Sequence, residues 1–227
     1  MEFDRSIEAV LLPLADPSRA AGMRAYMRGQ FEYLGIPTPA RRLAIRSLVR
    51  SFNPAQPEAL RGAALALWSR REREYHYAAA DLLVHHSGAL GAADISWLLE
   101  LAQQKAWWDS VDALAKVVGR VVRASGARGK KQMDRAIRAK DMWVRRIAMI
   151  HQLGWRGETD TVRLFRYAEI LAPESEFFLR KAAGWALCDY AWHDWRAVAA
   201  FLKRAGDRIS PLTYREATKN FPALKNA

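Results

Sequence analysis

Apolar residues recur three and four positions apart along most of the chain, and strict alternation of apolar and polar residues is scarce. This period is typical of amphipathic α-helices that bury one face. Four sites place a capping side chain directly before a proline, a common way to begin a helix: Asp16-Pro17, Thr38-Pro39, Asn53-Pro54 and Ser210-Pro211. The pattern therefore predicts an all-α protein of about a dozen helices joined by short turns.

Four helical segments resemble one another, each opening with an aromatic residue followed by small or apolar residues. They begin at Tyr75, Trp108, Trp143 and Phe178, which lie 33, 35 and 35 residues apart. A period of this length is typical of stacked helix pairs in a solenoid. Because the signature residues of tetratricopeptide repeats are absent, we favour a HEAT-like stack. An irregular helical bundle is the alternative.

Residues at the same position in successive repeats are expected to line one surface of such a stack. The last two repeats carry basic residues at the second and third positions after the aromatic: Arg145, Arg146, Arg180 and Lys181. The sequence thus predicts a basic concave face that can hold an extended ligand such as a DNA duplex. No long linker rich in serine, glycine or proline interrupts the chain, so we expect a single domain over residues 1–227.

The overall charge favours the same kind of ligand. The 227 residues include 36 Lys and Arg against 24 Asp and Glu, a net charge of +12, and 27 of the basic residues are Arg. Arginine suits bidentate contact with phosphate, which favours a nucleic-acid partner. The alternatives are an acidic membrane or protein partner, or an arginine bias imposed by a GC-rich genome.

Several classes of protein are not indicated. No run approaches 18 apolar residues, so no transmembrane helix is predicted, and the acidic start Met1-Glu2-Phe3-Asp4 is unlike a signal peptide. We therefore expect a cytoplasmic protein. P-loop, dinucleotide-binding and nucleophile-elbow motifs are absent and the five histidines lack metal-ligand spacing, so no metal or cofactor is predicted. The one cysteine, Cys188, lies in an apolar stretch typical of a structural thiol.

The strongest candidate for chemistry is the segment Ala106–Asp112. Trp108 and Asp112 are four residues apart and share one helical face. The other repeats carry apolar residues at the position of Asp112: Ala79, Ile147 and Ala182. Since an unpaired buried carboxylate is costly, Asp112 is expected either to pair with Arg145 or Arg146 or to face a cleft.

Tryptophan beside a carboxylate and an arginine can act on a cationic base. An aromatic ring face attracts cations, and a carboxylate stabilises positive charge that develops on a sugar. An N-alkylated purine is already cationic and leaves readily, so its removal would need neither a metal nor a strong general acid. Trp185, which shares a helical face with Lys181, is a second aromatic candidate for such a site.

With these residues the chain resembles the AlkD-type DNA alkylation repair proteins, which are alkylpurine DNA glycosylases built from HEAT-like helical repeats. The resemblance rests on four stretches: residues 23–42, Trp107–Asp112, Trp143–Arg146 and Lys181–Trp185. It implies a monomeric, monofunctional, metal-independent enzyme that hydrolyses the N-glycosidic bond of cationic N3- and N7-alkylated purines in double-stranded DNA. The product would be an abasic site. The protein would be associated with the nucleoid when bound to DNA.

The resemblance also implies roles for residues at matching positions. Asp112 is expected to be the catalytic carboxylate, and Arg146 to support it. Trp108 and Trp185 are expected to flank the deoxyribose of the lesion. Contacts with DNA are implied for four residues near the N-terminus: Tyr26, Thr38, Arg41 and Arg42.

One departure from the family pattern concerns Cys188, which stands where an Arg is expected. A phosphate contact is then either lost or supplied by Arg180 or Lys181. The sequence leaves two other functions open, namely a non-catalytic HEAT-like protein that binds damaged or branched DNA, and a protein-interaction scaffold. The carboxylate at Asp112 favours the enzyme over both.

Overall fold

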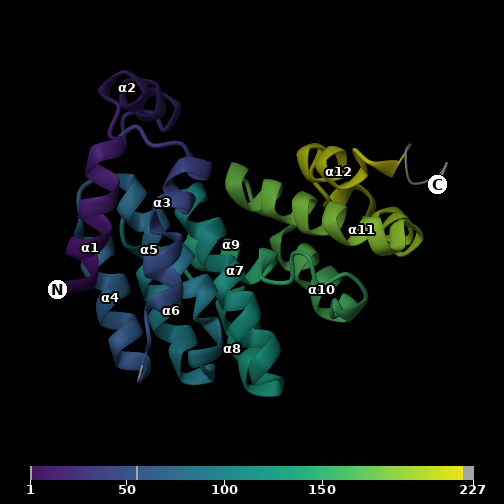
Figure 1. Cartoon of the computed structure of the whole chain (residues 1–227). Coiled ribbons are helices and arrows are strands. Elements are labelled where there is room, and N and C mark those ends of the chain that lie inside the picture. Colours follow the sequence, from purple (N-terminus) through teal and green to yellow (C-terminus); the bar gives the residue numbers. More distant parts are fainter. Residues whose placement is uncertain (1, 55, 222–227) are drawn as a thin grey trace. The chain divides into compact units, whose positions relative to one another are not determined.

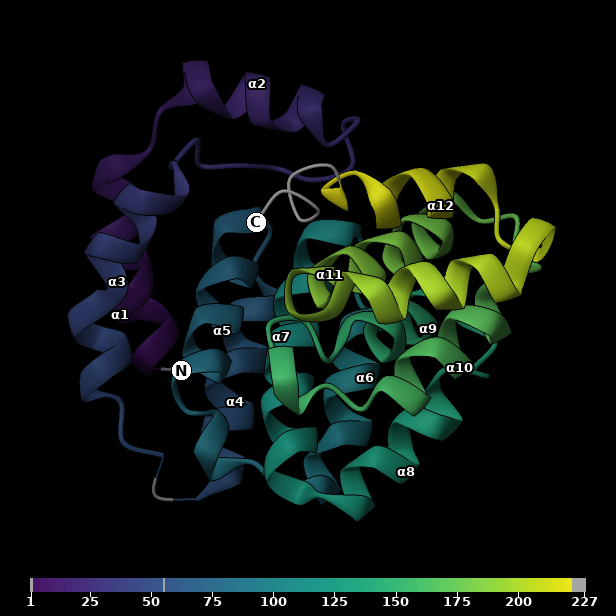
Figure 2. The same ribbon diagram turned by 90° about the vertical axis from the view of Figure 1, so that its right-hand side faces the viewer.

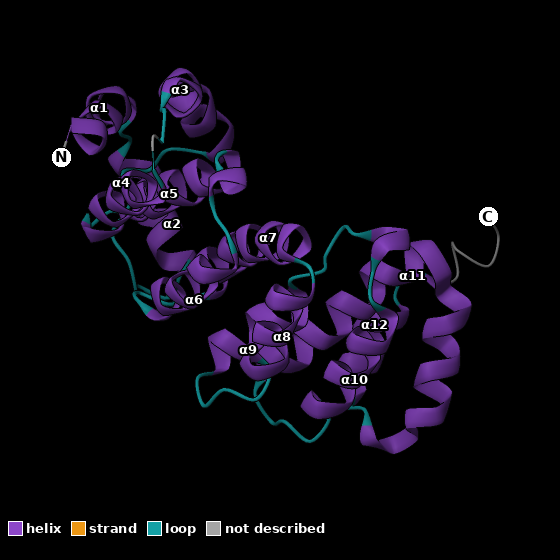
Figure 3. Ribbon diagram, turned by 90° about the horizontal axis from the view of Figure 1, so that it is seen from below, coloured by secondary structure: helices purple, strands orange, loops and turns teal. Residues whose placement is uncertain are grey.

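The computed structural model describes residues 2–54 and 56–221. Within these ranges the chain forms twelve α-helices and five short 3-10 helices and has no strand beyond one isolated bridge between Glu32 and Glu72 (Figure 3). The predicted all-α fold is confirmed. No helix in the described ranges has the length and apolar character needed to cross a bilayer.

The chain divides into two compact units, residues 1–90 and 91–227. The first contains α1 (Glu2–Leu11), α2 (Pro17–Tyr26), α3 (Thr38–Ser51), α4 (Pro57–Ser69) and α5 (Arg73–His85) (Figure 1). The single domain expected over residues 1–227 stays a prediction.

In the first unit α5 packs against α3 and α4, and α1 packs against α3. The start of α5 also holds the loop that follows α2. The buried carboxylate of Glu74 accepts hydrogen bonds from the backbone N–H groups of Leu34, Gly35 and Ile36 at 2.9–3.1 Å. Gly35 has φ +87°, and a Cβ there would lie 2.1 Å from the carbonyl oxygen of Asp16, so this close approach needs glycine.

The second unit contains the remaining helices. These are α6 (Ile95–Gln103), α7 (Trp108–Ser125), α8 (Ala127–Ala136), α9 (Met142–Ile150), α10 (Thr161–Leu171), α11 (Phe177–Ala205) and α12 (Pro211–Thr218). They pack as successive pairs, α6 on α7, α8 on α9 and α10 on α11, and α7, α9 and α11 also pack against one another in that order. Figure 2 shows α12 lying along α11.

The four repeat aromatics all fall in the first turn of a helix. Tyr75 lies in α5, Trp108 in α7, Trp143 in α9 and Phe178 in α11. The sequence period therefore corresponds to alternate helices of the chain, as expected for a helical-repeat solenoid. The assignment of these pairs to the HEAT-like class stays a prediction.

Two glycines and one kink allow this packing. A Cβ on Gly119 of α7 would lie 2.1 Å from the carbonyl oxygen of His151, so glycine lets α7 approach the end of α9. Gly184 of α11 similarly lies against Glu216 of α12. Asp194 interrupts α11 with φ −145° and ψ 85°, and its carboxylate caps the following segment by accepting from the N–H of Ala197.

Candidate functional site

The centre of the site is a carboxylate–guanidinium pair between neighbouring helices. Arg146 of α9 donates from Nε to Oδ1 of Asp112 at 2.7 Å and from Nη2 to Oδ2 at 2.8 Å. Its third nitrogen, Nη1, donates to the carbonyl oxygen of Phe178 at 2.7 Å. This bidentate geometry, with a further acceptor, fixes Asp112 of α7 relative to both α9 and α11.

Burial makes the pair electrostatically strong. Arg146 is buried, whereas the side chain of Asp112 remains 18% exposed. Burial raises the pKa of Asp112 and the nearby carboxylate of Asp109 adds to the rise, while Arg146 opposes both effects. Asp112 is thus a partly desolvated carboxylate with one face held by Arg146 and some surface left for a ligand.

An aromatic cluster packs the starts of the three helices that carry this pair and its acceptor. The rings of Trp107, Trp143 and Phe178 lie with their centroids 5.0–5.8 Å apart where α7, α9 and α11 begin. Asp141 caps α9 by accepting from the N–H groups of Trp143 and Val144. Because the start of α9 is held in this way, Arg146 is presented to Asp112 one turn later.

Asp112 opens onto a cavity of about 490 Å³. Trp185 of α11, 39% exposed, lines the same cavity and is thereby brought together with Asp112. Trp108 lies one turn before Asp112 on α7, is half-buried, and is not among the residues that line the cavity. The geometry supports an aromatic surface beside an oriented carboxylate, which suits a cationic or electron-deficient ligand.

The residues predicted near the N-terminus gather within the first unit. Tyr26, at the end of α2, is 73% exposed and lines a pocket of about 290 Å³ together with Thr38 and Arg41. Arg41 is buried, donates to Asp81 at 3.1 Å and lies 4.8 Å from the ring centroid of Tyr77.

Arg42 is exposed and shares the same carboxylate, with Nη2 3.0 Å from Asp81. The burial of Arg41 therefore favours a role in holding Asp81, and Arg42 presents the accessible charge. The contacts of all four residues with DNA stay predictions.

Comparison with known proteins identifies the family. A family described as "DNA alkylation repair enzyme" matches residues 7–221. The chain belongs to this family. A solved structure described as a predicted DNA alkylation repair enzyme from Enterococcus faecalis is 31% identical, with a TM-score of 0.81. The match covers 90% of this chain and 95% of that chain. No curated protein matches the chain.

Membership of the DNA alkylation repair family indicates an enzyme that takes part in the repair of alkylation damage, with DNA as its substrate. The matched range covers most of each unit and includes every candidate site residue. No group of three or more potential metal ligands occurs among the described residues of this repair protein.

The basic row predicted from the repeats is largely paired in this repair protein. Arg145 forms an ion pair with Glu174, and Arg180 donates from Nε to the carbonyl oxygen of Glu174 at 2.6 Å. Lys181 lies 2.9 Å from Glu216. The partners of these three residues come from segments that the repeat spacing does not include. Contact of the three residues with DNA stays a prediction.

A basic stripe that the repeat alignment missed lies on α7 itself. Lys116, Arg120 and Arg123 are exposed and line the cavity with Asp112. Arg123 pairs with Glu158 and lies 6.0 Å from the ring centroid of Trp155, which also lines the cavity. The spacing of four, four and three residues from Asp112 could have revealed this stripe, since it follows one helical face.

Cys188 is buried against the segment that follows α12. Asn220 donates from Nδ2 to its Sγ at 3.2 Å, and burial raises the pKa of the thiol. This environment agrees with the structural thiol predicted from the sequence. The side chain at this position points into the protein, so the departure from the expected Arg leaves no reactive cysteine at the surface.

Proposed function

We propose that the protein is a monofunctional DNA glycosylase that hydrolyses the N-glycosidic bond of cationic N3- and N7-alkylated purines in duplex DNA. The observation that carries the proposal is the partly exposed carboxylate of Asp112, held by Arg146 and facing a cavity lined by Trp185. We further propose that the protein acts as a monomer in the cytoplasm. It would be associated with the nucleoid when bound to DNA.

The reaction depends mainly on the cationic base being a good leaving group. The bond between C1′ of the sugar and the purine nitrogen breaks heterolytically, and its electron pair neutralises the positive charge on the base. The sugar becomes oxocarbenium-like, and the carboxylate of Asp112 stabilises this charge. Water then adds to C1′ and gives its proton to Asp112 or to solvent, which leaves an abasic site.

The environment of Asp112 suits both roles. Partial burial strengthens its attraction for positive charge, because little water screens the interaction. The rise in the pKa of Asp112 that burial produces also makes it a better proton acceptor than an exposed carboxylate. Arg146 keeps the carboxylate oriented by occupying both oxygens from one side.

The aromatic and basic residues position the substrate. The exposed ring of Trp185 offers a face to the sugar and to the cationic base, and Trp108 is proposed to contact the sugar from α7. Lys116, Arg120 and Arg123 supply positive charge along α7 that suits the phosphates flanking the lesion. A cationic purine needs no Lewis acid to depart, so we propose a mechanism independent of metal and of cofactor.

The proposal is tested by base release from a duplex that carries one 7-methylguanine. The wild type and Asp112→Asn are compared under single-turnover conditions, and the binding of each to the same duplex is measured at two salt concentrations. We expect release above the spontaneous rate for the wild type and a loss of about a hundredfold or more in the variant, with binding retained.

Absence of release by the wild type on duplexes with 7-methylguanine and with 3-methyladenine, combined with salt-dependent binding, would overturn the proposal. That result would favour the alternative, a non-catalytic protein that recognises damaged or branched DNA.

A further inference from the structure

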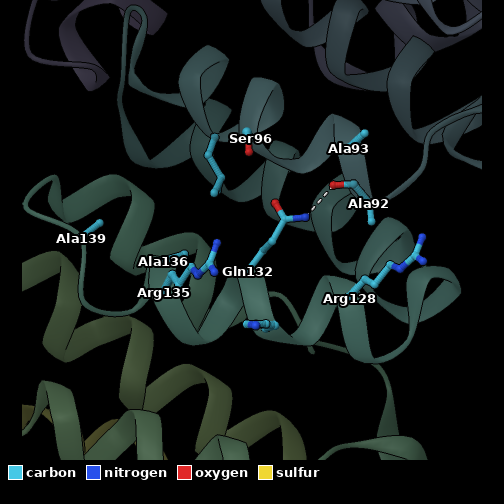
Figure 4. Close-up of a pocket in the computed structure, with 10 residues that line it drawn as sticks. Ala92, Ala93, Ser96, Arg128, Gln132, Arg135, Ala136 and Ala139 are labelled. Carbon is cyan, nitrogen blue, oxygen red and sulfur yellow. Dashed lines mark hydrogen bonds between the residues drawn. The ribbon is translucent and has the colours of Figure 1, made fainter.

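A second cationic groove lies in the unit formed by residues 91–227, between the start of α6 and α8. It has a volume of about 700 Å³ and shares no lining residue with the Asp112 cavity. Figure 4 shows α8 along one side, carrying Arg128, Gln132 and Arg135, and the segment around Ala92 and Ser96 on the other. Lys131 of α8 completes its basic residues.

A direct contact joins the two sides of the groove. Gln132 donates from Nε2 to the carbonyl oxygen of Ala92 at 2.6 Å (Figure 4). Much of the remaining lining consists of small side chains, namely Ala92, Ala93, Ala136 and Ala139. Small residues leave room for a ligand, and the residues that line the groove include no large aromatic anchor of the kind that protein-binding surfaces favour.

The charges of α8 are divided between two faces. Lys130 pairs with Asp160 at 3.2 Å, and Asp134, the acidic residue of this helix, pairs with Arg163 of α10 at 2.9 Å. Asp134 also accepts a hydrogen bond from Tyr167 at 2.8 Å. The one acidic side chain of α8, Asp134, thus faces α10 and is paired there.

A different face carries Arg128, Lys131 and Arg135, all exposed. None of the ten residues that line the groove is acidic. Like charges three and four residues apart weaken a helix. The three basic residues of this row therefore do not serve to stabilise α8. The first turn of α8 also lacks an acidic residue, so no side chain of that turn offsets the positive end of the helix dipole.

We propose that this groove is a second DNA-binding surface that takes the phosphate backbone of a duplex. Arg128 and Arg135 are seven residues apart, about 10 Å along the helix at about 1.5 Å per residue. One DNA strand carries about three phosphates over that length, at about 3.4 Å each along the axis. Three cations therefore match three phosphates. The alanine side chains that line the groove leave room for the sugar-phosphate backbone.

The inference rests on DNA being the partner, as family membership indicates, and it does not depend on base excision by Asp112. Its function would be to retain the protein on DNA, or to engage a segment away from the lesion, through contacts that carry no sequence information. The residues of this row are separate from the machinery proposed for excision.

The test compares two triple variants with the same loss of charge. One is Arg128→Gln/Lys131→Gln/Arg135→Gln, and the control is Arg196→Gln/Lys203→Gln/Arg204→Gln on the exposed face of α11. Circular dichroism checks that both are folded. Binding to an undamaged duplex of about 25 base pairs is measured across a salt series, together with single-turnover release of 7-methylguanine at saturating protein.

We expect the slope of log affinity against log salt to fall by about 2.7 for the groove variant, at about 0.9 for each lost phosphate contact. The control should change by less than one, and both should release base within twofold of the wild type. Equal slopes for the two triple variants would overturn the inference. So would an unchanged slope combined with lost binding to polyglutamate, which would assign the groove to an acidic protein.

Loss of release in Asp112→Asn is measured separately, so the excision proposal and the groove proposal can fail independently.

Discussion

Arg146 contacts both carboxylate oxygens of Asp112 and, through its third nitrogen, the carbonyl oxygen of Phe178. One buried side chain thereby connects three alternate helices of the chain, α7, α9 and α11. A carboxylate oriented in this way requires little reorganisation when positive charge develops next to it. The same contact makes the site and the packing of the unit interdependent.

Replacing Arg146 tests this interdependence. Arg146→Ala leaves the largely buried Asp112 without its partner, and we expect a loss of about 3 kcal/mol in the free energy of unfolding, measured with urea. Arg146→Lys keeps the charge but not the bidentate geometry, so it should retain more stability while base release slows.

The double variant Arg146→Ala/Asp112→Asn is the control for the buried charge. It should recover part of the stability lost in Arg146→Ala, because no unpaired carboxylate remains. Equal stability of the single and double variants would contradict the assigned role of Arg146.

Trp185 is predicted to contact the ligand rather than to stabilise the fold. It is 39% exposed and lines the cavity, whereas Trp192 on the same helix is 62% exposed and does not. Trp185→Ala should lower single-turnover base release by about tenfold or more, with a change in unfolding free energy below about 1 kcal/mol. Trp192→Ala is the matched control and should leave release unchanged, and equal effects of the two substitutions would remove Trp185 from the site.

Lys116 lies in the same cavity as Asp112, which makes the monofunctional mechanism testable. We expect the abasic product to stay intact and no covalent adduct to form with borohydride, because the proposed reaction uses water rather than an amine. Lys116→Gln should reduce the salt slope of DNA binding by about 0.9. A borohydride-trapped complex that disappears in Lys116→Gln would show a lyase step and refute this prediction.

His151 predicts how stability depends on pH. It is buried, donates from Nδ1 to the carbonyl oxygen of Ala148, and burial lowers its pKa from 6.5 to about 4. Between pH 6.5 and 4 the unfolded chain binds this proton and the folded protein does not, so stability falls as the pH is lowered. The loss from this group amounts to about 3 kcal/mol over the window, at about 1.4 kcal/mol for each pH unit.

Urea unfolding at several pH values checks this dependence. His151→Gln should have a flatter profile between pH 6.5 and 4, while His85→Gln, at an exposed histidine, should follow the wild type. A wild-type profile that is as flat as that of His151→Gln would contradict the assignment.

Local sequence pattern was sufficient for the helices of this protein. The spacing of apolar residues predicts an all-α chain, and the recurring aromatics predict where α5, α7, α9 and α11 begin. Both properties depend on residues within a few turns of one another, so they can be read along the chain. The candidate carboxylate Asp112 was also visible locally, as a charge at an otherwise apolar repeat position.

Which cation pairs with which acid depended on contacts between distant segments. The sequence left Arg145 and Arg146 as equal candidates for Asp112, and the structure assigns Asp112 to Arg146 and Glu174 to Arg145. Adjacent residues on a helix point about 100° apart, so the packing of α9 between α7 and α11 makes this choice.

The sequence by itself therefore determined the helical class, the repeat and the candidate chemistry, because periodicity and residue type act locally. Only the tertiary structure decided which basic residues stay accessible. Arg145, Arg180 and Lys181 pair with acids or carbonyl groups of other segments, whereas Lys116 and Arg120 of α7 and the row on α8 line open cavities. Pairing of charges depends on which helix faces meet, and that arrangement is set by the packing of the whole unit.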